Sequence, residues 1–370
     1  MKVALVHYWL LTMRGGERVL QALSEMYPDA DIYAHVINRE MAEKEFSGHK
    51  LYETFISRLP FAKRLYQNYL PLMPMALEQI DFSGYDLVIS SESGPAKGIV
   101  VPPGVAHICY CHSPMRYAWD MYHEYRRNAG LLKRLLMPVL MHRIRMWDAL
   151  SSMRVDHFIA NSNFVAERIR KYYRRDTEVI HPPVSSDDFY ISSQVSDHYL
   201  MLGQLVPYKR TDLAVEAFNQ SGRKLIIVGE GEELSRLKKL AGPNVTFLGR
   251  QSFSNIKKLY AECQALIFPG VEDFGIVPLE AMASGRPVIA LGKGGAMETV
   301  VAGKTGVFFF ESNVASLNEA VQYYENNRDQ FDPKAIRAHA EKFSVAIFKE
   351  NMHAFIEKAK NTSMARKPIS

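Results

Sequence analysis

Cysteine is scarce in this chain of 370 residues, which contains only Cys109, Cys111 and Cys263. Three cysteines cannot form a disulfide framework, so the sequence is not typical of a small secreted domain and fits a reducing cytoplasm. No apolar run approaches the roughly 18 residues that a membrane-spanning helix needs, which excludes a transmembrane protein. The first residues lack the cleavage site of a secretory signal, and we expect residues 2–7 to form a buried strand instead.

A strong charge excess is also absent, since 45 Lys and Arg stand against 40 Asp and Glu, with a pI near 8.9. This balance does not indicate nucleic-acid binding, and no nucleic-acid partner is expected. No internal repeat or low-complexity stretch is present. With 47% hydrophobic residues, a chain of this length can bury two cores, so two domains are expected.

Short apolar strands alternate with helical patterns along the first half, which is typical of parallel βαβ units. Residues 51–80 are rich in Leu, Met, Tyr and Pro without a regular period, so we expect an inserted surface element there. The expected strands lie at 2–7, 31–35, 85–90, 107–111, 157–160 and 177–181, and an expected helix lies at 17–26.

Two consecutive prolines, Pro182 and Pro183, cannot continue a helix or a central strand and mark the domain boundary. A second doubly wound α/β domain of Rossmann type follows, and residues 344–360 form one more helix. We therefore predict domains at 1–184 and 185–343, with a C-terminal helical segment at 344–370. The expected strands of the second domain lie at 199–202, 225–228, 245–248, 265–268, 288–290 and 307–309, and its helices at 210–219, 233–240, 254–262 and 278–284.

Basic residues gather between Met121 and Arg175, where twelve Lys or Arg stand against four acids. Within this patch, residues 130–143 mix apolar and basic side chains with a helical period. One interpretation is an interfacial helix on an anionic membrane surface. The other is an ordinary amphipathic helix packed on its own domain.

His107, Cys109 and Cys111 alternate along one expected strand and invite a test for a metal site. Side chains two positions apart in a strand point parallel to each other instead of converging. No second Cys or His cluster is present to complete a tetrahedron. We favour buried free thiols, and no metal site is expected.

Two carboxylates, Glu272 and Glu280, lie eight positions apart across a turn that opens a helix. The expected strand 265–268 ends at Pro269, and Pro278 marks the start of the next helix. Between them, Phe274, Gly275 and Ile276 offer free backbone N–H groups at a helix N-terminus, a favourable site for a diphosphate. The alternative is a solvated loop acid followed by a helix-capping acid.

This spacing resembles the E-x7-E signature of the family 4 glycosyltransferases. The resemblance implies the GT-B architecture, in which two Rossmann-like domains face each other across a cleft and a C-terminal helix crosses back to the first. It assigns the acceptor to the N-terminal domain and the nucleotide sugar to the second. It further implies that Glu280 binds the ribose hydroxyls and that Glu272 meets hydroxyls of the donor sugar.

The segment Gly203 to Arg210 follows a strand and opens a helix, which directs Lys209 and the helix N-terminus to one place. It resembles the family's donor-phosphate motif, in which an arginine and a lysine hold the diphosphate. Lys209 matches, but the uncharged Gln204 stands where the family has arginine. Either Arg210 supplies the second cation, or the leaving group is held more weakly.

The resemblance extends to four further places in the chain. Gly231 falls in a donor-facing loop, and Arg250 ends the stretch whose backbone reads the nucleotide base. Gly15 and Gly16 open the first helix, where the alternatives are phosphate or acceptor contact and a plain tight turn. His112 matches the family histidine that touches the donor sugar, although a lone histidine is more often structural.

No Ser-His-Asp set or nucleophilic carboxylate is apparent. Family 4 enzymes retain the anomeric configuration, and the usual proposal is front-face attack in which the leaving phosphate takes the acceptor proton. Such a route needs electrostatic preorganisation more than a titrating base. Glu272, Lys209 and His112 are then the expected catalytic residues, with no cofactor and no divalent metal implied.

The motifs around Gly15, His112 and Lys209 look like those of bacterial mannosyltransferases that build O-antigen. The resemblance implies GDP-mannose as donor, a lipid-linked oligosaccharide as acceptor, and a cytoplasmic enzyme on the inner face of the bacterial inner membrane. Three alternatives remain: a glycosyltransferase using a UDP- or dTDP-sugar, a sugar-nucleotide epimerase, and a non-catalytic nucleotide-binding protein. The last is motivated by Gln204.

Overall fold

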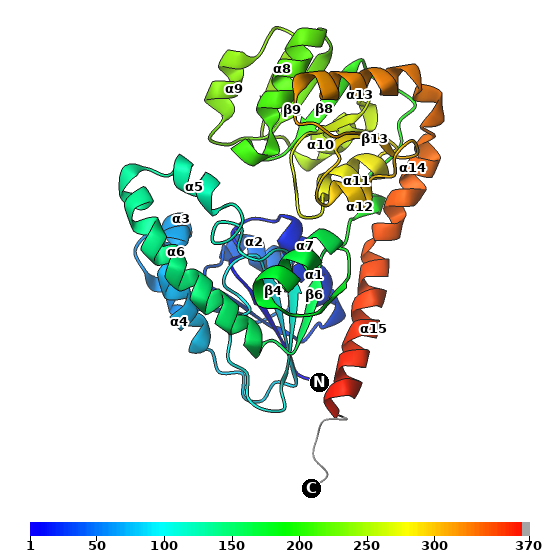
Figure 1. Cartoon of the computed structure of the whole chain (residues 1–370). Helices are drawn as coiled ribbons and strands as arrows, with labels where there is room; N and C mark the ends of the chain where they lie inside the picture. The colour runs from blue at the N-terminus through cyan, green and yellow to red at the C-terminus, as the bar shows by residue number, and fades with distance from the viewer. Residues whose placement is uncertain (365–370) are drawn as a thin grey trace. The chain divides into compact units, whose positions relative to one another are not determined.

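The structure is a computed structural model that describes residues 1–364 (Figure 1). The chain forms two compact units, which we call unit 1 and unit 2. Unit 1 comprises Met1–Pro182 together with the chain from Phe348 onward, and unit 2 comprises Pro183–Ile347. The boundaries after residues 184 and 343, with the ligand assigned to each domain, stay predictions.

Unit 1 is built on a seven-stranded parallel sheet with the order β3-β2-β1-β4-β5-β6-β7. Its first six strands follow the order of a Rossmann fold. The central strand β1 is buried along its whole length, as expected for a parallel sheet covered on both faces. The strands are β1 (Val3–His7), β2 (Asp31–Ala34), β3 (Leu51–Glu53), β4 (Leu87–Glu92), β5 (Ala106–Cys111), β6 (His157–Ala160) and β7 (Thr177–Val179).

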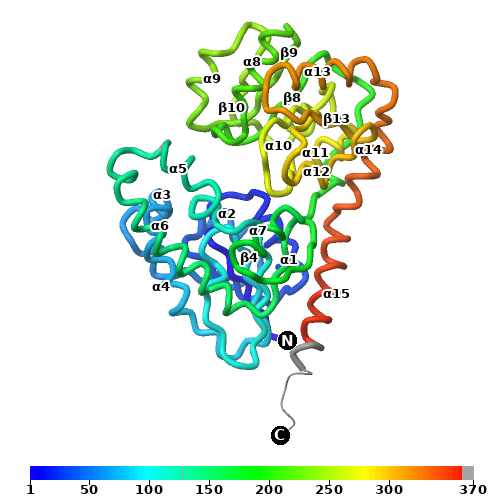
Figure 2. The backbone as a smooth tube through the Cα atoms, viewed as in Figure 1, coloured from blue at the N-terminus to red at the C-terminus, as the bar shows by residue number. Residues whose placement is uncertain are grey.

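Helices connect these strands, and the longest, α6 (Leu131–Ser151), lies beside α3 and α4 in both Figure 1 and Figure 2. Ser162 caps α7, because its hydroxyl accepts the backbone N–H of Val165 at 3.1 Å. The other helices are α1 (Gly15–Met26), α2 (Arg39–Glu45), α3 (Ala62–Leu65), α4 (Met73–Glu78), α5 (Tyr122–Asn128) and α7 (Asn163–Tyr173), with 3-10 turns η1 (Phe55–Arg58), η2 (Tyr66–Leu72) and η3 (Ser152–Arg154).

The last helix, α15 (Val345–Met364), packs on unit 1 from Phe348 onward. The Phe348 ring lies 5.8 Å from the Tyr110 ring, centroid to centroid. Ion pairs hold the exposed side of the helix, since Lys349 Nζ lies 2.5 Å from Glu25 Oε2 and Lys358 contacts Glu178. The sequence thus returns to the first sheet after it has formed unit 2.

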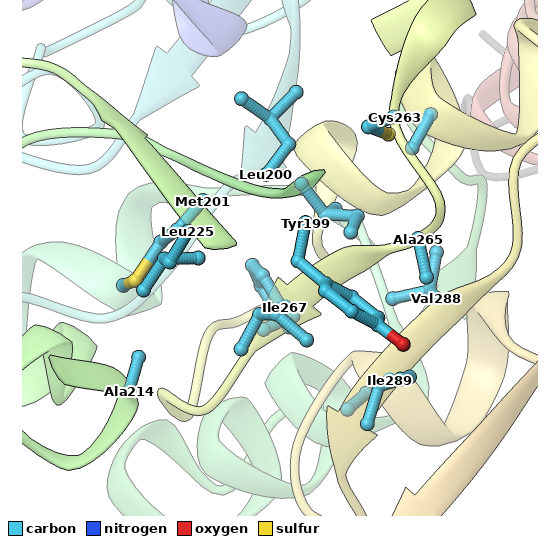
Figure 3. Close-up of a cluster of buried hydrophobic side chains, with 14 of the residues drawn as sticks. Tyr199, Leu200, Met201, Ala214, Leu225, Cys263, Ala265, Ile267, Val288 and Ile289 are labelled. Carbon is cyan, nitrogen blue, oxygen red and sulfur yellow. The ribbon is translucent and has the colours of Figure 1, made fainter. Parts of the chain in front are cut away.

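Unit 2 contains a six-stranded parallel sheet with the order β10-β9-β8-β11-β12-β13, again that of a Rossmann fold. Figure 3 shows part of its core, where Tyr199, Leu225, Ile267 and Val288 from four adjacent strands come together. The strands are β8 (His198–Leu202), β9 (Lys224–Val228), β10 (Val245–Gly249), β11 (Leu266–Phe268), β12 (Val288–Leu291) and β13 (Gly306–Phe309).

The helices of unit 2 lie close to the predicted ranges where a prediction was made. The sequence analysis did not identify α13 or α14, although Asp332 and Pro333 at the start of α14 form a typical N-terminal signal. The elements are η4 (Ser186–Asp188), η5 (Pro207–Lys209), α8 (Thr211–Ser221), α9 (Leu234–Leu240), α10 (Phe253–Glu262), α11 (Ile276–Ala283), α12 (Ala296–Thr299), α13 (Val314–Asn326), η6 (Arg328–Gln330), α14 (Pro333–Ala340) and η7 (Glu341–Phe343).

The prediction of two doubly wound α/β folds is confirmed, and one local prediction was wrong. Residues 51–80 are not wholly an inserted surface element, because Leu51–Glu53 forms β3 at the edge of the first sheet and pairs with β2. Three residues are too short a run to show a period. Cys109 and Cys111 are buried free thiols in β5, as predicted.

Two buried histidines of unit 1 are expected to make it sensitive to acid. Burial lowers the pKa of His35 to about 4 and that of His107 to about 4. Below the unfolded value of about 6.5, the unfolded chain binds more protons than the folded chain, so stability falls as the pH falls. Each histidine should remove up to about 2 kcal/mol between pH 6.5 and pH 5.

The measurement is urea unfolding at pH 7.5 and pH 5, followed by tryptophan fluorescence. All three tryptophans, Trp9, Trp119 and Trp147, lie in unit 1, so the signal reports on that unit. His107→Asn should reduce the loss of stability between the two pH values, whereas His123→Asn, at an exposed position, should not. An equal loss in wild type and His107→Asn would contradict this account.

Candidate functional site

The carboxyl edge of the unit 2 sheet brings Lys209 and Glu272 together. Lys209 ends the turn η5 after β8, and Glu272 lies in the loop after the neighbouring strand β11. Lys209 Nζ lies 2.6 Å from Glu272 Oε1, and the two side chains are 15% and 20% exposed. Ligands of open α/β sheets bind at this edge, where the strand order reverses beside the first strand.

The loop that carries Glu272 is held by the glycines after β12, which the sequence analysis did not identify. Gly295 donates its backbone N–H to the carbonyl oxygen of Glu272 at 2.9 Å. A Cβ atom at Gly295 would overlap the backbone of Phe274, so only glycine permits this approach. The signal was present as Gly294 and Gly295 three residues after an apolar strand, but sequence alone does not show which loop they touch.

Glu280 lies in α11 and accepts a hydrogen bond from the Tyr260 hydroxyl at 2.9 Å. Burial raises the pKa of Tyr260, and Glu280 and Glu272 both add to this effect. The negative charges of Glu272 and Glu280 therefore both act on the buried hydroxyl of Tyr260. Tyr260 is a second residue of this region that the sequence analysis missed.

The turn before α11 differs slightly from the prediction. The helix begins at Ile276 rather than at Pro278, because Gly275 takes a φ of +98° and caps it. Phe274 is 3% exposed, so its side chain belongs to the core and only its backbone is suited to contact a ligand. The backbone N–H groups at Ile276 and beyond open the helix, as the anion-site interpretation requires.

The two candidates for the second cation have different surroundings. Gln204 is exposed after β8. The guanidinium of Arg210 is held at Nε by Asp212, at 3.2 Å, and at its terminal nitrogen by the Ser312 hydroxyl, at 2.6 Å. Recruitment of Arg210 to a diphosphate would have to compete with both of these contacts.

Gly231 and Arg250 follow β9 and β10, on one side of β8 in the sheet. A Cβ atom at Gly231 would collide with the carbonyl of Leu205, so the glycine allows the two loops to pack together. Arg250 is exposed. Arg250 follows the outermost strand β10, whereas the Lys209 segment follows β8, two strands away in the sheet.

The carboxyl edge of unit 1 brings Gly16 and His112 together. His112 follows β5, and its Nε2 lies 2.8 Å from the Ser91 hydroxyl at the end of β4. A Cβ atom at Gly16, in the first turn of α1 next to Gly15, would lie 2.6 Å from the Tyr8 hydroxyl and 3.6 Å from His112 Nε2. Burial, together with the neighbouring His7, lowers the pKa of His112, so its imidazole is neutral at physiological pH.

Two family models match consecutive parts of the chain. The model described as Glycosyltransferase Family 4 matches residues 13–188, and the model described as Glycosyl transferases group 1 matches residues 194–343. The chain belongs to glycosyltransferase family 4.

Curated relatives of this glycosyltransferase include mannosyltransferases. The O-antigen chain mannosyltransferase RfbU of Salmonella typhimurium is 31% identical over 38% of this chain and 43% of its own length. The GDP-mannose-dependent alpha-(1-6)-phosphatidylinositol monomannoside mannosyltransferase of Mycobacterium tuberculosis is 36% identical over 35% of this chain and 38% of its own length. The chain thus spans less than half the length of either relative.

Solved structures share the fold of this family 4 glycosyltransferase. HepE of Anabaena, crystallised in complex with UDP, superposes with a TM-score of 0.71 at 18% identity, covering 97% of this chain and 100% of that one. The architecture is GT-B. Within residues 1–364, no helix has the length and apolar character needed to cross a membrane.

Proposed function

We propose that this glycosyltransferase transfers mannose from GDP-mannose to a lipid-linked oligosaccharide, with retention of anomeric configuration, in bacterial O-antigen synthesis. The 2.6 Å pair of Lys209 and Glu272 at the carboxyl edge of unit 2 carries the proposal. The pair supports the proposal because an ammonium group can bind a phosphate and a carboxylate can accept a hydrogen bond from a sugar hydroxyl. The mannose assignment is supported by the two mannosyltransferase relatives.

Each residue of this region then has a separate task. The bond between the sugar C1 and the phosphate oxygen breaks, and Lys209 stabilises the charge that develops on the departing phosphate. Glu272 accepts hydrogen bonds from the donor sugar, and Glu280 accepts them from the ribose. The acceptor oxygen bonds to C1, and its proton passes to the released phosphate oxygen. His112, Gly15 and Gly16 contribute donor contacts from unit 1, and this route requires no divalent metal.

The donor assignment is tested by incubating the purified protein with GDP-, UDP- and dTDP-sugars and a lipid-linked acceptor extract. We expect nucleoside diphosphate release with GDP-mannose, an α-linked product by NMR, and no loss of rate in EDTA. Clear turnover with UDP-sugars alone would refute the mannose assignment. Donor incubated alone in heavy water should show no deuterium uptake, which separates transfer from epimerisation.

A membrane surface is proposed as a partner because α6 exposes apolar and basic side chains together. The helix packs on its own unit through Met141 and Ile144, both buried. Towards its N-terminus, Lys133 and Arg134 are exposed among five apolar side chains that are more than half exposed. These are Leu131, Leu132, Leu135, Leu136 and Val139, at 57% to 87%. Such a surface favours the interfacial interpretation and a peripheral location on the cytoplasmic face of the inner membrane.

Replacing two of these leucines with glutamate is expected to weaken vesicle binding at least tenfold. Leu131→Glu with Leu135→Glu removes apolar area worth about 1.5–3 kcal/mol per side chain and adds negative charge. Sedimentation with vesicles of phosphatidylglycerol and phosphatidylethanolamine measures the binding. The binding of the wild type should fall steeply as the salt concentration rises. Phe310→Glu, at a 64% exposed position of unit 2, is the matched control. The proposal would be contradicted if the wild-type protein did not bind these vesicles, or if its binding did not depend on the salt concentration.

A further inference from the structure

The sheet of unit 2 has an open edge along β13, the last strand in its order. In the part of the chain that the structure describes, no strand of the sheet pairs with this side of β13. A cavity of about 730 Å³ beside it is lined by residues of β13 and α13. A turn covers only the start of the strand, where Gly303 donates its backbone N–H to the carbonyl oxygen of Gly306 at 2.9 Å. The rest of the edge is a template for pairing with another strand.

The alternation of the backbone along β13 identifies the groups that face the open side. The carbonyl oxygens of Thr305 and Phe309 accept hydrogen bonds from the β12 segment, at 3.1 and 2.8 Å. Successive residues of a strand direct their N–H and C=O groups to opposite sides. The residues between and after these two therefore direct their groups away from β12. Beyond the covered start of the strand, these residues are Phe308 and Phe310.

The side chains at these two positions are aromatic and share one face of the sheet. The ring centroids of Phe308 and Phe310 lie 6.2 Å apart, and Phe310 is 64% exposed. The Phe310 ring rests on the sheet, because a Cβ atom at Gly292 would lie 2.6 Å from it. Met297 of α12, also near Gly292, is 51% exposed and extends the apolar surface. Protected edges carry Lys or Pro, whereas this edge carries two phenylalanines that another surface could bury.

The charges that flank the open edge have opposite signs. Lys304 precedes β13, Glu311 follows Phe310, and both side chains are exposed. A second copy of the strand, laid antiparallel, brings its Glu311 towards Lys304 and its Lys304 towards Glu311. A parallel copy would instead bring like charges together, which is unfavourable. The edge is therefore complementary in charge to an antiparallel copy of itself.

We propose that two copies of this chain associate through β13 about a twofold axis, so that their six-stranded sheets become continuous. Phe308 of each copy lies directly opposite Phe310 of the other, and each such pair exchanges two backbone hydrogen bonds. The phenylalanine rings of both copies pack together on one face, as cross-strand aromatic pairs do. Lys304 of each copy lies near Glu311 of the other. Because the same patch is used on both sides, the assembly closes at two copies.

The test is the molar mass in solution, measured by sedimentation velocity at protein concentrations from about 0.5 to about 100 µM. The wild type should shift reversibly from one copy to two, with a micromolar dissociation constant because the contact is small. Phe310→Glu should raise that constant at least tenfold, since it places a carboxylate among the rings. Tyr190→Glu, at a 47% exposed aromatic position of unit 2, is the matched control and should leave it unchanged.

A charge exchange tests the antiparallel pairing separately from the aromatic contact. Lys304→Glu should raise the dissociation constant about threefold to tenfold at low salt, since it replaces two weak attractions by two repulsions. Lys304→Glu combined with Glu311→Lys should restore the wild-type constant, because the charges are again opposite across the interface. Both positions are exposed, so circular dichroism should show unchanged thermal unfolding.

A wild type that remains a single copy at about 100 µM would overturn the proposal, because even weak specific interfaces associate in this range. Association that is unaffected by Phe310→Glu would exclude β13 from the contact. A charge exchange that fails to restore association would exclude the antiparallel pairing. Since Phe310→Glu is also the control for vesicle binding, that comparison is made below the dissociation constant, where the wild type too is a single copy.

Discussion

Replacing Lys209 with alanine is expected to lower kcat/KM by about 10²–10³-fold, which is the usual effect of removing one preorganised group from a developing anion. The ammonium lies 2.6 Å from the carboxylate of Glu272, and the Lys209 side chain is only 15% exposed, so water replaces it poorly. The stabilisation that this ammonium provides increases as negative charge develops on the departing phosphate. We therefore expect kcat to fall more than donor affinity, as for an interaction made mainly in the transition state.

A matched control for this variant lies at the opposite edge of the same sheet. Lys224 and Asp197 form an ion pair of the same 2.6 Å length, but they are 63% and 71% exposed. Lys224 is the first residue of β9, and Asp197 directly precedes β8. Lys224→Ala should change neither rate nor stability by a measurable amount. Initial rates of nucleoside diphosphate release measure both variants. Equal rates for Lys209→Ala and wild type would exclude Lys209 from the reaction.

Glu272→Gln distinguishes loss of the carboxylate from loss of the ammonium. The amide keeps the size of the side chain and can still accept a hydrogen bond from a sugar hydroxyl. Lys209 then loses its ionic partner but remains available to the phosphate. We expect a smaller loss than in Lys209→Ala, and the double variant should lose less than the product of the two single effects.

Local patterns in the sequence account for much of the fold. Apolar runs such as residues 158–160, bounded by polar or turn residues, coincide with strands because parallel strands are buried on both faces. The positions of Glu272 on a loop and Glu280 on a helix also followed from local signals, the end of β11 and the helix start. Both predictions depend on residues close together in the chain.

Contacts between distant segments were not predictable in the same way. The contact of Gly295 with the Glu272 loop, and the hydrogen bond from Tyr260 to Glu280, depend on how strands and helices pack. Strand β3 was missed because Leu51–Glu53 has too few residues to show alternation. The hydrogen bond between Arg210 and Ser312 likewise joins residues that are far apart in the sequence, so it could not be predicted from local patterns. Together with the contact between Arg210 and Asp212, it holds the Arg210 guanidinium.

A buried ion cluster formed by Lys97, Glu92 and Asp148 also joins distant segments, and it is expected to dominate the stability of unit 1. All three side chains are fully buried, and Lys97 Nζ contacts Glu92 Oε1 at 3.3 Å as well as Asp148 Oδ1. Asp148 Oδ2 also accepts hydrogen bonds from Trp119 and Tyr173, at 2.7 and 2.9 Å. The cluster joins the end of β4 to α6 and α7, so it positions the helix that carries the proposed membrane surface.

Lys97→Met is expected to destabilise unit 1 by about 3–5 kcal/mol, because removing one partner leaves two buried carboxyl groups without a cation. Burial lowers the pKa of Lys97, but Asp148 and Glu92 outweigh it and hold the pKa above its ordinary value, so the wild-type ammonium stays charged. Burial already raises the pKa of Glu92, and the variant removes the cation that opposes this rise, so the folded chain takes up a proton there as the pH falls. The difference from wild type should therefore be larger at pH 7.5 than at pH 5.5.

Urea unfolding followed by tryptophan fluorescence measures this difference at both pH values. Lys97→Met combined with Asp148→Asn removes one uncompensated charge, and the amide oxygen can still accept from Trp119 and Tyr173. It should be more stable than Lys97→Met alone at pH 7.5. Lys63→Met, at an exposed position of α3, is the control for loss of a positive charge and should be neutral. If Lys97→Met unfolds at the wild-type urea concentration, the ion cluster does not hold α6 against the sheet, and apolar packing through Met141 and Ile144 must do so instead.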